Sequence, residues 1–264
     1  MDVKQYIPQV IEALETASEK IMEFYENGFE INIKADKSPV TEADLSSNYI
    51  ITSYLHQFNI PIISEEEVKP KYEERKNESL LWLVDPLDGT KEFILKSGQF
   101  CICIALIENG KPILGFIASP TENKILFGGH SIGAFEIPFG IDNPLDNKWK
   151  LKQPKVNQPS VLIRSNAPLK ESTINFIEKL KKQEGELNYI NKGSALKFFD
   201  LLKGNADFYI RLAPTMEWDI AAGQAIFETI DGEIRNIETN EILTYNKKDL
   251  RNPHFFASIR KNNI

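Results

Sequence analysis

A run of apolar segments joined by short turns occupies the first half of the chain, and it limits the fold more than any other feature. Residues 80–85 (LLWLVD) predict a buried strand, and further apolar segments follow between residues 99 and 129. Asn-Gly-Lys-Pro at 109–112 and Pro-Thr-Glu-Asn at 120–123 separate these segments with residue types that favour turns. The pattern predicts an antiparallel meander of strands.

Two helices are predicted before the meander. Apolar residues recur at helical spacing over 7–27, and Gly28 is expected to end this helix. A second helix is expected over 41–58, where Thr41 and Asp44 have the spacing of a capping box. Shorter elements are expected around them: a half-buried strand at 29–34, a turn at 36–39, a buried strand at 60–64 and a charged surface loop or lid at 66–79.

The pattern changes after residues 136–159, which are rich in Pro, Asn and Lys. Strand and helix patterns then alternate, as they do in α/β layering. The expected strands are 160–165, 187–190, 206–212 and 254–259, and the expected helices are 170–183, 194–203 and 218–230. We therefore predict an α+β half over residues 1–150, packed on an α/β half over residues 151–264.

Charge and composition restrict the ligand and the location. The net charge of −7 argues against a broad electrostatic contact with a nucleic acid polymer, but a small phosphate ligand needs only a local positive field or a metal. No apolar run reaches the roughly 18 residues of a membrane helix, and the N-terminus lacks a secretory signal. Cys101 and Cys103 are expected as buried thiols on one face of a strand. These features predict a cytoplasmic protein; association with the surface of the inner membrane is left open, although acidic surfaces disfavour anionic lipid.

Paired acids follow the strand at 80–85. Asp85 and Asp88 lie three positions apart in DPLDGT, where Pro86 and Gly89 shape a tight turn. Such a turn can direct both carboxylates and a peptide carbonyl toward one point, and hard cations such as Mg²⁺ prefer oxygen ligands. The residue types alone fit an Asp-rich turn that caps a helix equally well.

Three further acids have both a functional and a structural interpretation, and for Glu65 the structural one is the start of a solvated charge run. Glu65 follows the strand at 60–64, and strand ends in layered folds open into clefts. Asp44 and Asp219 lie near the starts of predicted helices, where capping alone explains an isolated acid. A bound metal would explain why several acids lie at such positions. Carboxylates that converge repel one another unless a positive charge compensates them.

The blocks VTEAD (40–44), SEE (64–66), DPLDGTKEF (85–93) and WDIAAG (218–223) together resemble the inositol monophosphatase superfamily of Mg²⁺-dependent, lithium-sensitive phosphatases. This resemblance implies an αβαβα layered sandwich that combines α+β and α/β parts. Within the superfamily, the chain is most similar to the 3′(2′),5′-bisphosphate nucleotidases of the CysQ type. Three segments carry that similarity: KEF after DGT, GSALK at 193–197 and RLAPT at 211–215, with Ala195 and Ala213 in place of a Ser and a Gly.

The resemblance also implies a role for each matching residue. The metal ligands would be Glu65, Asp85, Asp88, Asp219 and the main-chain carbonyl of Leu87, and all of these except Asp85 would also contact the substrate. Asp44 and Thr90 would orient and deprotonate the attacking water. The N–H groups of Gly89 and Thr90 would hold the phosphate at a helix start. Ser194, Lys197 and Arg211 are the candidates for binding the second phosphate of the substrate.

The reaction implied is Mg²⁺-dependent hydrolysis of adenosine 3′,5′-bisphosphate to AMP and phosphate, by direct attack of a metal-activated water, in sulfur assimilation. Two or three Mg²⁺ ions are expected, with Li⁺ as an inhibitor. An inositol monophosphatase or a sugar (bis)phosphatase with the same metal chemistry is the alternative, and a non-catalytic nucleotide-binding relative is the alternative of another class. Dimers are common among relatives, so a homodimer is left open.

Overall fold

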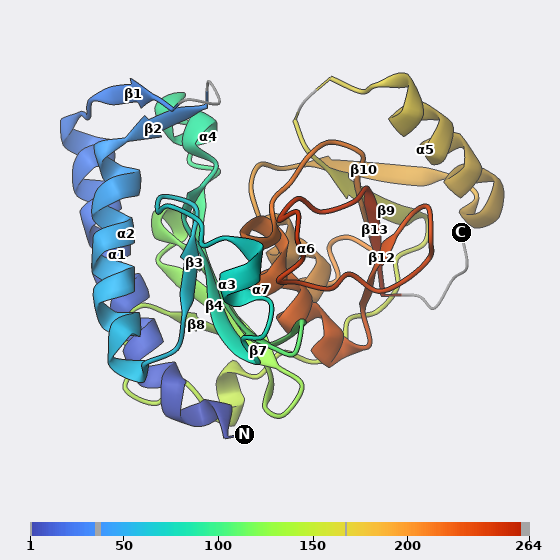
Figure 1. The fold of residues 1–264 in the computed structure, drawn as a ribbon. Helices are drawn as coiled ribbons and strands as arrows, with labels where there is room; N and C mark the ends of the chain where they lie inside the picture. The colour runs from blue at the N-terminus through green and yellow to red at the C-terminus, as the bar shows by residue number, and fades with distance from the viewer. Residues whose placement is uncertain (1, 35–37, 167, 260–264) are drawn as a thin grey trace.

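The computed structural model describes residues 2–34, 38–166 and 168–259 and arranges them in alternating layers of helix and sheet (Figure 1). An outer layer holds α1 (Ile7–Asn27) and α2 (Glu42–Leu55), and the opposite outer layer holds α5 (Glu171–Glu184). Between them lie two sheets, which enclose α6 (Lys197–Lys203) and α7 (Glu217–Phe227). This order is the αβαβα sandwich implied by the sequence, and the prediction is confirmed.

The first sheet contains the predicted meander. Its strands in the described part of the chain are β3 (Ile62–Ser64), β4 (Leu80–Asp88), β5 (Cys101–Glu108), β6 (Lys111–Ser119), β7 (Lys124–Gly129) and β8 (Gly133–Pro138), which neighbour one another in that order. β3 and β4 run parallel, whereas β4 to β8 pair antiparallel. The register of β4 against β5 shifts between Asp85 and Asp88, so the ladder is irregular where the paired acids lie.

Both faces of this sheet are buried, which explains why its strands are almost continuously apolar. In β5, Cys101 and Cys103 belong to the core shared with α6 and α7, whereas Ile102 and Ile104 belong to the core beneath α1 and α2. The two cysteines are buried free thiols on one face of the strand, as predicted.

The second sheet follows the 136–159 segment. Its strands are β9 (Ser160–Arg164), β10 (Leu187–Asn191), β11 (Phe208–Arg211), β12 (Glu233–Asn236) and β13 (Phe255–Ser258), in the spatial order β10-β9-β11-β13-β12 among the described residues. β9 is parallel to β10 and β11, and β13 is antiparallel to β11 and β12. α5 packs Phe176, Ile177 and Leu180 against this sheet.

Close packing positions α7 between the sheets. A Cβ atom at Gly115 of β6 would lie 2.2 Å from the carbonyl oxygen of Ala222, so only glycine permits this approach. On the other side of the helix, a Cβ atom at Gly223 would overlap the ring of Phe198 in α6. Small residues on both contacts therefore determine where the N-terminus of α7 lies, and this end of the helix carries Asp219.

Short elements complete the fold. They are the helices α3 (Tyr72–Arg75) and α4 (Thr90–Ile94), the strands β1 (Ile31–Ile33) and β2 (Pro39–Thr41), and the 3-10 helices Val3–Tyr6, His56–Phe58, Pro120–Glu122, Asn147–Trp149 and Glu228–Ile230. No helix within residues 2–34, 38–166 and 168–259 combines the length and apolarity that crossing a membrane requires.

Several local predictions were wrong. The strand at 29–34 is not half-buried, because β1 pairs with β2 in a ribbon apart from the main sheets, and Ile33 is 67% exposed. The expected turn at 36–39 falls partly on residues 35–37, which lie outside the described residues. The 136–159 segment begins inside β8, and the helix expected at 194–203 begins at Lys197, because Ser194 has a positive φ of 46°.

The charged segment 66–79 also differs from its prediction as a surface loop or lid. It contains α3, and the side chain of Arg75 at the end of that helix is buried, with 4% of the residue exposed. Arg75 donates hydrogen bonds to residues 246–248 in the second half of the chain. A charged side chain was expected in solvent, but backbone carbonyls and an amide replace water here.

Candidate active site

Three of the predicted acids meet where β3, β4 and α7 end or begin. Glu65 follows β3 and Asp85 lies in β4, and the parallel pairing of these strands brings both acids to the same edge of the sheet. Asp219 reaches this edge from the first turn of α7. One carboxylate oxygen from each of the three residues lies within 4.8 Å of those of the other two. Residues far apart in sequence therefore form one acidic cluster.

Asp88 and Leu87 line the same cavity as this cluster. Asp88 directs Oδ2 toward the second half of the chain, where this oxygen accepts a hydrogen bond from the backbone N–H of Ala195 and lies 3.7 Å from Cys101 Sγ. The carbonyl oxygen of Leu87 lies 3.4 Å from Thr90 Oγ1, and the N–H of Leu87 donates to Asp85 Oδ1 at 3.1 Å. Asp88 thus connects the acidic cluster with the segment 193–197.

Asp44 caps α2 and also accepts a hydrogen bond from Thr90, while its catalytic role stays a prediction. Its Oδ2 accepts hydrogen bonds from the N–H and hydroxyl of Thr41 at 2.8 and 2.6 Å, which completes the predicted capping box of α2. Its Oδ1 accepts a 2.9 Å hydrogen bond from Thr90 Oγ1. The capping interaction therefore orients the carboxylate toward Thr90.

Gly89 places Thr90 at the start of α4. Its φ of 101° lies in the left-handed region, and a Cβ atom there would lie 3.0 Å from the carbonyl oxygen of Gln99. Any other residue would therefore be strained by its backbone conformation and crowded by Gln99. The first N–H groups of a helix have no partner within the helix, and both Gly89 and Thr90 line the cavity that contains the acidic cluster.

A second pocket adjoins the first and collects the predicted second-half residues. Ser194, Lys197 and Arg211 line it together with Asp88 and Asp219. Lys197 is 3% exposed, and its ammonium donates a 2.6 Å hydrogen bond to the carbonyl oxygen of Ser194. Arg211 Nε is buried and has no hydrogen-bond partner among the described residues. All three candidates therefore lie beside the acidic cluster, although their contact with a substrate stays a prediction.

Three acids at the site, Asp85, Asp88 and Asp219, have raised pKa values. Burial raises the pKa of Asp85 well above its ordinary value, and the carboxylates of Glu65, Asp88 and Asp219 raise it further. Burial, followed by the charge of Asp88, likewise raises the pKa of Asp219. Burial raises the pKa of Asp88 to about 6, although Lys197 acts in the opposite direction. Asp85 and Asp219 are therefore harder to ionise than in water, first because they are buried and second because neighbouring carboxylates have the same charge.

Lys34 partly compensates this charge, and sequence analysis did not identify it. Its ammonium lies 3.0 Å from Glu65 Oε1 and 2.6 Å from Glu66 Oε1. Burial tends to lower the pKa of Lys34, but the charges and hydrogen bonds of Glu65 and Glu66 raise it to about 12. The acidic cluster therefore already attracts one cation supplied by the chain itself.

The comparison of this chain with known proteins agrees with the geometry. The model of the inositol monophosphatase family matches residues 2–262, which is nearly the whole chain. The chain belongs to the inositol monophosphatase family. It is 33% identical over 257 residues to the 3′(2′),5′-bisphosphate nucleotidase CysQ of Shigella flexneri, a match that covers 96% of this chain and 99% of that one.

Solved structures of the inositol monophosphatase family show the same fold. The crystal structure of CysQ from Bacteroides thetaiotaomicron, described as a bacterial member of the family, superposes with a TM-score of 0.87 and 35% identity, covering 98% of this chain and 99% of that one. A structure described as IMPase/NADP phosphatase complexed with Mg²⁺ and phosphate has a TM-score of 0.78 at 19% identity and covers 98% of this chain and 92% of that one. The latter similarity concerns the fold alone.

The acidic cluster of this family member suits a hard divalent cation. Glu65, Asp85 and Asp219 offer oxygen donors, which Mg²⁺ prefers. Burial and the neighbouring carboxylates raise the pKa values of Asp85 and Asp219, and Lys34 places one compensating charge beside Glu65. A divalent ion would relieve this repulsion, so the residues present fit the metal that the family uses.

Two further contacts at the site were missed from the sequence. Trp218 Nε1 donates a 3.0 Å hydrogen bond to Glu65 Oε2, and the ammonium of Lys69 donates to the carbonyl oxygen of Glu65 while lying 5.0 Å from the centre of the Trp218 ring. The Trp of the WD pair was available as a signal, because it directly precedes Asp219. Nothing in the local sequence distinguished Lys34 or Lys69 from solvent-exposed lysines.

Proposed function

We propose that the protein is a Mg²⁺-dependent 3′(2′),5′-bisphosphate nucleotidase that hydrolyses adenosine 3′,5′-bisphosphate to AMP and phosphate. The observation that carries this proposal is the shared pocket, which both the acids Asp88 and Asp219 and the cations Lys197 and Arg211 line. A metal-binding cluster accounts for one phosphate of the substrate. The cations account for a second phosphate, which a simple monophosphate lacks.

Lys197 and Arg211 are suited to bind an anionic group of the substrate that the reaction does not cleave. Burying an ammonium such as that of Lys197 is unfavourable unless a counter-charge is near. The buried Nε–H of Arg211, which has no partner among the described residues, requires a hydrogen-bond acceptor. A 5′-phosphate that is bound but not cleaved would meet both needs, and arginine can pair with phosphate through two parallel hydrogen bonds. Ser194, at the head of the same segment, lines this part of the pocket.

Glu65, Asp85, Asp88, Asp219 and the carbonyl of Leu87 would hold two or three Mg²⁺ ions. Bound Mg²⁺ would supply Lewis-acid neutralisation of charge on the phosphoryl group and on the leaving oxygen. Li⁺ is expected to inhibit by competing for this donor set. The N–H groups of Gly89 and Thr90 would bind an oxygen of the cleaved phosphate.

Thr90 and Asp44 would accept the proton that the attacking water loses. Thr90 Oγ1 donates a hydrogen bond to Asp44, so the lone pairs of Oγ1 are available to accept a hydrogen bond from a water in the cavity. As the water oxygen bonds to phosphorus and the bond from phosphorus to the 3′ oxygen breaks, the water proton passes to Thr90 Oγ1. The threonine proton passes at the same time to Asp44 Oδ1, and the 3′ oxygen of AMP takes up a proton from solvent.

A comparison of substrates tests the proposal. Purified protein with Mg²⁺ is assayed for phosphate release from adenosine 3′,5′-bisphosphate, inositol 1-phosphate and fructose 1,6-bisphosphate, with Asp85→Asn as a control. A preference for the nucleotide that Asp85→Asn abolishes supports the proposal. A preference for inositol 1-phosphate or the sugar bisphosphate would retain the metal site and reject the substrate. Tight nucleotide binding without turnover, measured by calorimetry, would instead support a non-catalytic binding protein.

A further inference from the structure

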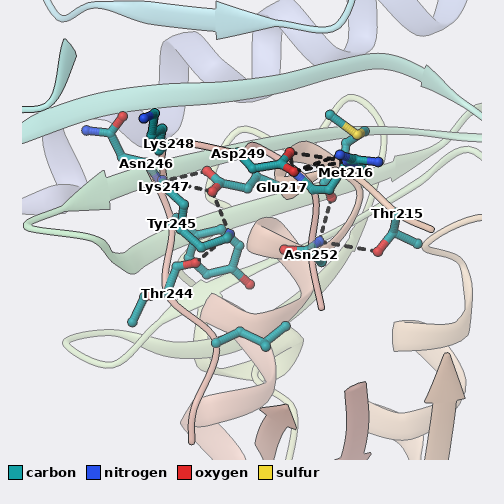
Figure 2. Close-up of polar contacts among 12 residues, drawn as sticks. Thr215, Met216, Glu217, Thr244, Tyr245, Asn246, Lys247, Lys248, Asp249 and Asn252 are labelled. Atoms are coloured by element: carbon teal, nitrogen blue, oxygen red, sulfur yellow. Dashed lines mark hydrogen bonds and ion pairs between the residues drawn. The ribbon is translucent and has the colours of Figure 1, made fainter. Parts of the chain in front are cut away.

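Glu217 is a fully buried carboxylate to which the proposed chemistry assigns no role. It is the first residue of α7 and stands two positions before Asp219. Its Oε2 accepts a 2.6 Å hydrogen bond from the N–H of Asn246, and its Oε1 accepts from the N–H and the ammonium of Lys247 at 3.0 and 2.6 Å (Figure 2). Three donors thus compensate a buried charge that would otherwise be strongly unfavourable.

The segment 244–252 is attached to the start of α7 at a second point. The side-chain amide of Asn252 donates to the carbonyl oxygen of Met216 at 2.6 Å and to Thr215 Oγ1 at 3.3 Å (Figure 2). In addition, the N–H of Glu217 donates to the carbonyl oxygen of Leu250 at 2.9 Å. The segment 244–252 is therefore joined to residues 215–217, at the start of α7.

Arg75 joins the same segment to the first half of the chain. Its Nη1 donates to Asn246 Oδ1 at 2.6 Å, and its Nη2 donates to the carbonyl oxygen of Lys247 at 2.8 Å. The side-chain amide of Asn246 donates in return to the carbonyl oxygen of Arg75 at 2.9 Å. Arg75 ends α3, in the segment that leads away from Glu65. A continuous set of part-buried polar contacts therefore runs from the segment after Glu65 to the start of α7.

The acidic cluster is itself divided between these two parts of the chain, because Glu65 belongs to one and Asp219 to the other. We infer that Arg75, Asn246 and Glu217 form a positioning brace, which holds Asp219 at a fixed separation from Glu65 so that the carboxylates are arranged for a divalent cation before it binds. Groups that orient metal ligands commonly contribute about 10- to 100-fold to metal affinity. The inference rests on the proposed metal-dependent function.

Metal binding without substrate tests the brace. Glu217→Gln keeps the shape of the side chain but removes its charge, and Asp207→Asn is the matched control. Asp207 is equally buried and accepts hydrogen bonds from the N–H groups of Asn157 and Val161 at 2.8 and 2.7 Å. It precedes β11, whereas Arg211 at the pocket ends that strand. Thermal unfolding of both variants establishes that they fold, and binding of Mn²⁺ is measured by electron paramagnetic resonance.

The brace requires Glu217→Gln to weaken Mn²⁺ binding by about tenfold or more, while Asp207→Asn lowers the Tm without changing Mn²⁺ affinity. Arg75→Met should weaken Mn²⁺ binding in the same direction, and combining it with Glu217→Gln should add little, because both changes break one network. If Glu217→Gln does not fold, Asn246→Ala removes the amide that joins the two parts and should show the same loss.

Unchanged Mn²⁺ affinity in these brace variants, or an equal loss in Asp207→Asn, would overturn the inference and leave a purely structural network. Because Mn²⁺ binding is measured without nucleotide, a failure of the proposed substrate would not affect this result. The two proposals can therefore fail separately.

Discussion

Thr90 Oγ1 donates a 2.9 Å hydrogen bond to Asp44 Oδ1, although the two residues are 46 positions apart. The other oxygen of the same carboxylate accepts from the N–H and hydroxyl of Thr41 and caps α2. Helix capping and the proposed proton transfer therefore use different oxygens of one side chain. The cap fixes the carboxylate in the orientation that the proposed chemistry requires.

Thr90→Val tests this pair, because valine keeps the shape of threonine but cannot relay a proton. We expect kcat to fall by about 10²- to 10⁴-fold, the usual contribution of general acid–base catalysis. Mn²⁺ affinity should change little, since the side chain of Thr90 is not among the proposed metal ligands. Thr90→Ser restores the hydroxyl and should recover most of the activity. A kcat within a few-fold of wild type in Thr90→Val would remove Thr90 from the proton path.

Asp85→Asn should change stability in opposite directions with and without metal. The pKa of Asp85 is raised by burial and by the neighbouring acids, so the ionised carboxylate destabilises the metal-free fold. In EDTA, we expect the variant to unfold a few degrees higher than wild type, because a destabilisation of ~1 kcal/mol is removed. In excess Mg²⁺, wild type should gain about 2.7 kcal/mol at a hundred times the dissociation constant, and the variant should gain much less.

Thermal unfolding in the two buffers measures this difference. Asp249→Asn serves as the control, because Asp249 is an exposed acid paired with Arg251. An Asp85→Asn variant whose Tm shifts equally in EDTA and in Mg²⁺ would show that Asp85 does not bind the metal.

The proposed second phosphate site should lose one of its two positive charges, that of Lys197, at mildly alkaline pH. Burial lowers the pKa of Lys197 to about 8, although the carboxylate of Asp88 acts in the opposite direction. Below this pH the ammonium can pair with phosphate, and above it the neutral amine binds less strongly. We expect kcat/KM for adenosine 3′,5′-bisphosphate to fall above pH 8, and Lys197→Met to reduce kcat/KM by about 10- to 100-fold at pH 7, as for a lost hydrogen bond to a charged group.

The lowered pKa of Lys197 also predicts how the free energy of unfolding depends on pH. Between pH 8 and 10.5 the unfolded chain retains a proton on Lys197 that the folded chain has released. This contribution to the free energy of unfolding therefore rises with pH in that window, and Lys197→Met should abolish the rise. Lys192→Met is the control, since Lys192 pairs with Asp200 and does not line the pocket. A pH profile of kcat/KM that is identical in Lys197→Met and wild type would exclude Lys197 from substrate binding.

Gly89→Ala should reduce both stability and activity, because alanine is strained at a φ of 101° and its Cβ would lie 3.0 Å from the carbonyl oxygen of Gln99. Gly28→Ala is a close control: its φ is 103°, but no atom would lie within 4 Å of the new Cβ. Each substitution should destabilise by about 1–3 kcal/mol through backbone strain, measured by urea unfolding. Only Gly89→Ala should also lower kcat at saturating Mg²⁺; equal activity in both variants would show that the α4 start does not hold the phosphate.

Much of the architecture could be predicted because its causes are local. The apolar periodicity of residues 7–27 and the glycine at 28 define α1, and the turns at 109–112 and 120–123 separate the strands of the meander. The DPLDGT turn brings Asp85, Leu87 and Asp88 to one cavity for a similar reason, since few residues separate them. Their roles as metal ligands stay predictions that the Mn²⁺ and Mg²⁺ measurements test.

The errors have a common cause. β1 was expected to be half-buried from its alternating pattern, but alternation does not specify whether a sheet lies beneath the strand. Arg75 was predicted to lie in a charged loop and no role was predicted for Glu217, because their partners lie 171 and 30 positions away, respectively. Lys34 likewise meets Glu65 only in the folded chain.

The amino-acid sequence by itself determined the helices, the meander, the paired acids and the family, because periodicity, turn chemistry and short motifs act over neighbouring residues. Only the tertiary structure decided which charges meet. The parallel pairing of β3 with β4 brings Glu65 beside Asp85. The close contact of Gly115 with Ala222 determines how near α7, and with it Asp219, lies to the first sheet. Electrostatic attraction and repulsion depend on distance in space, and that distance exists only once the sheets and helices have packed.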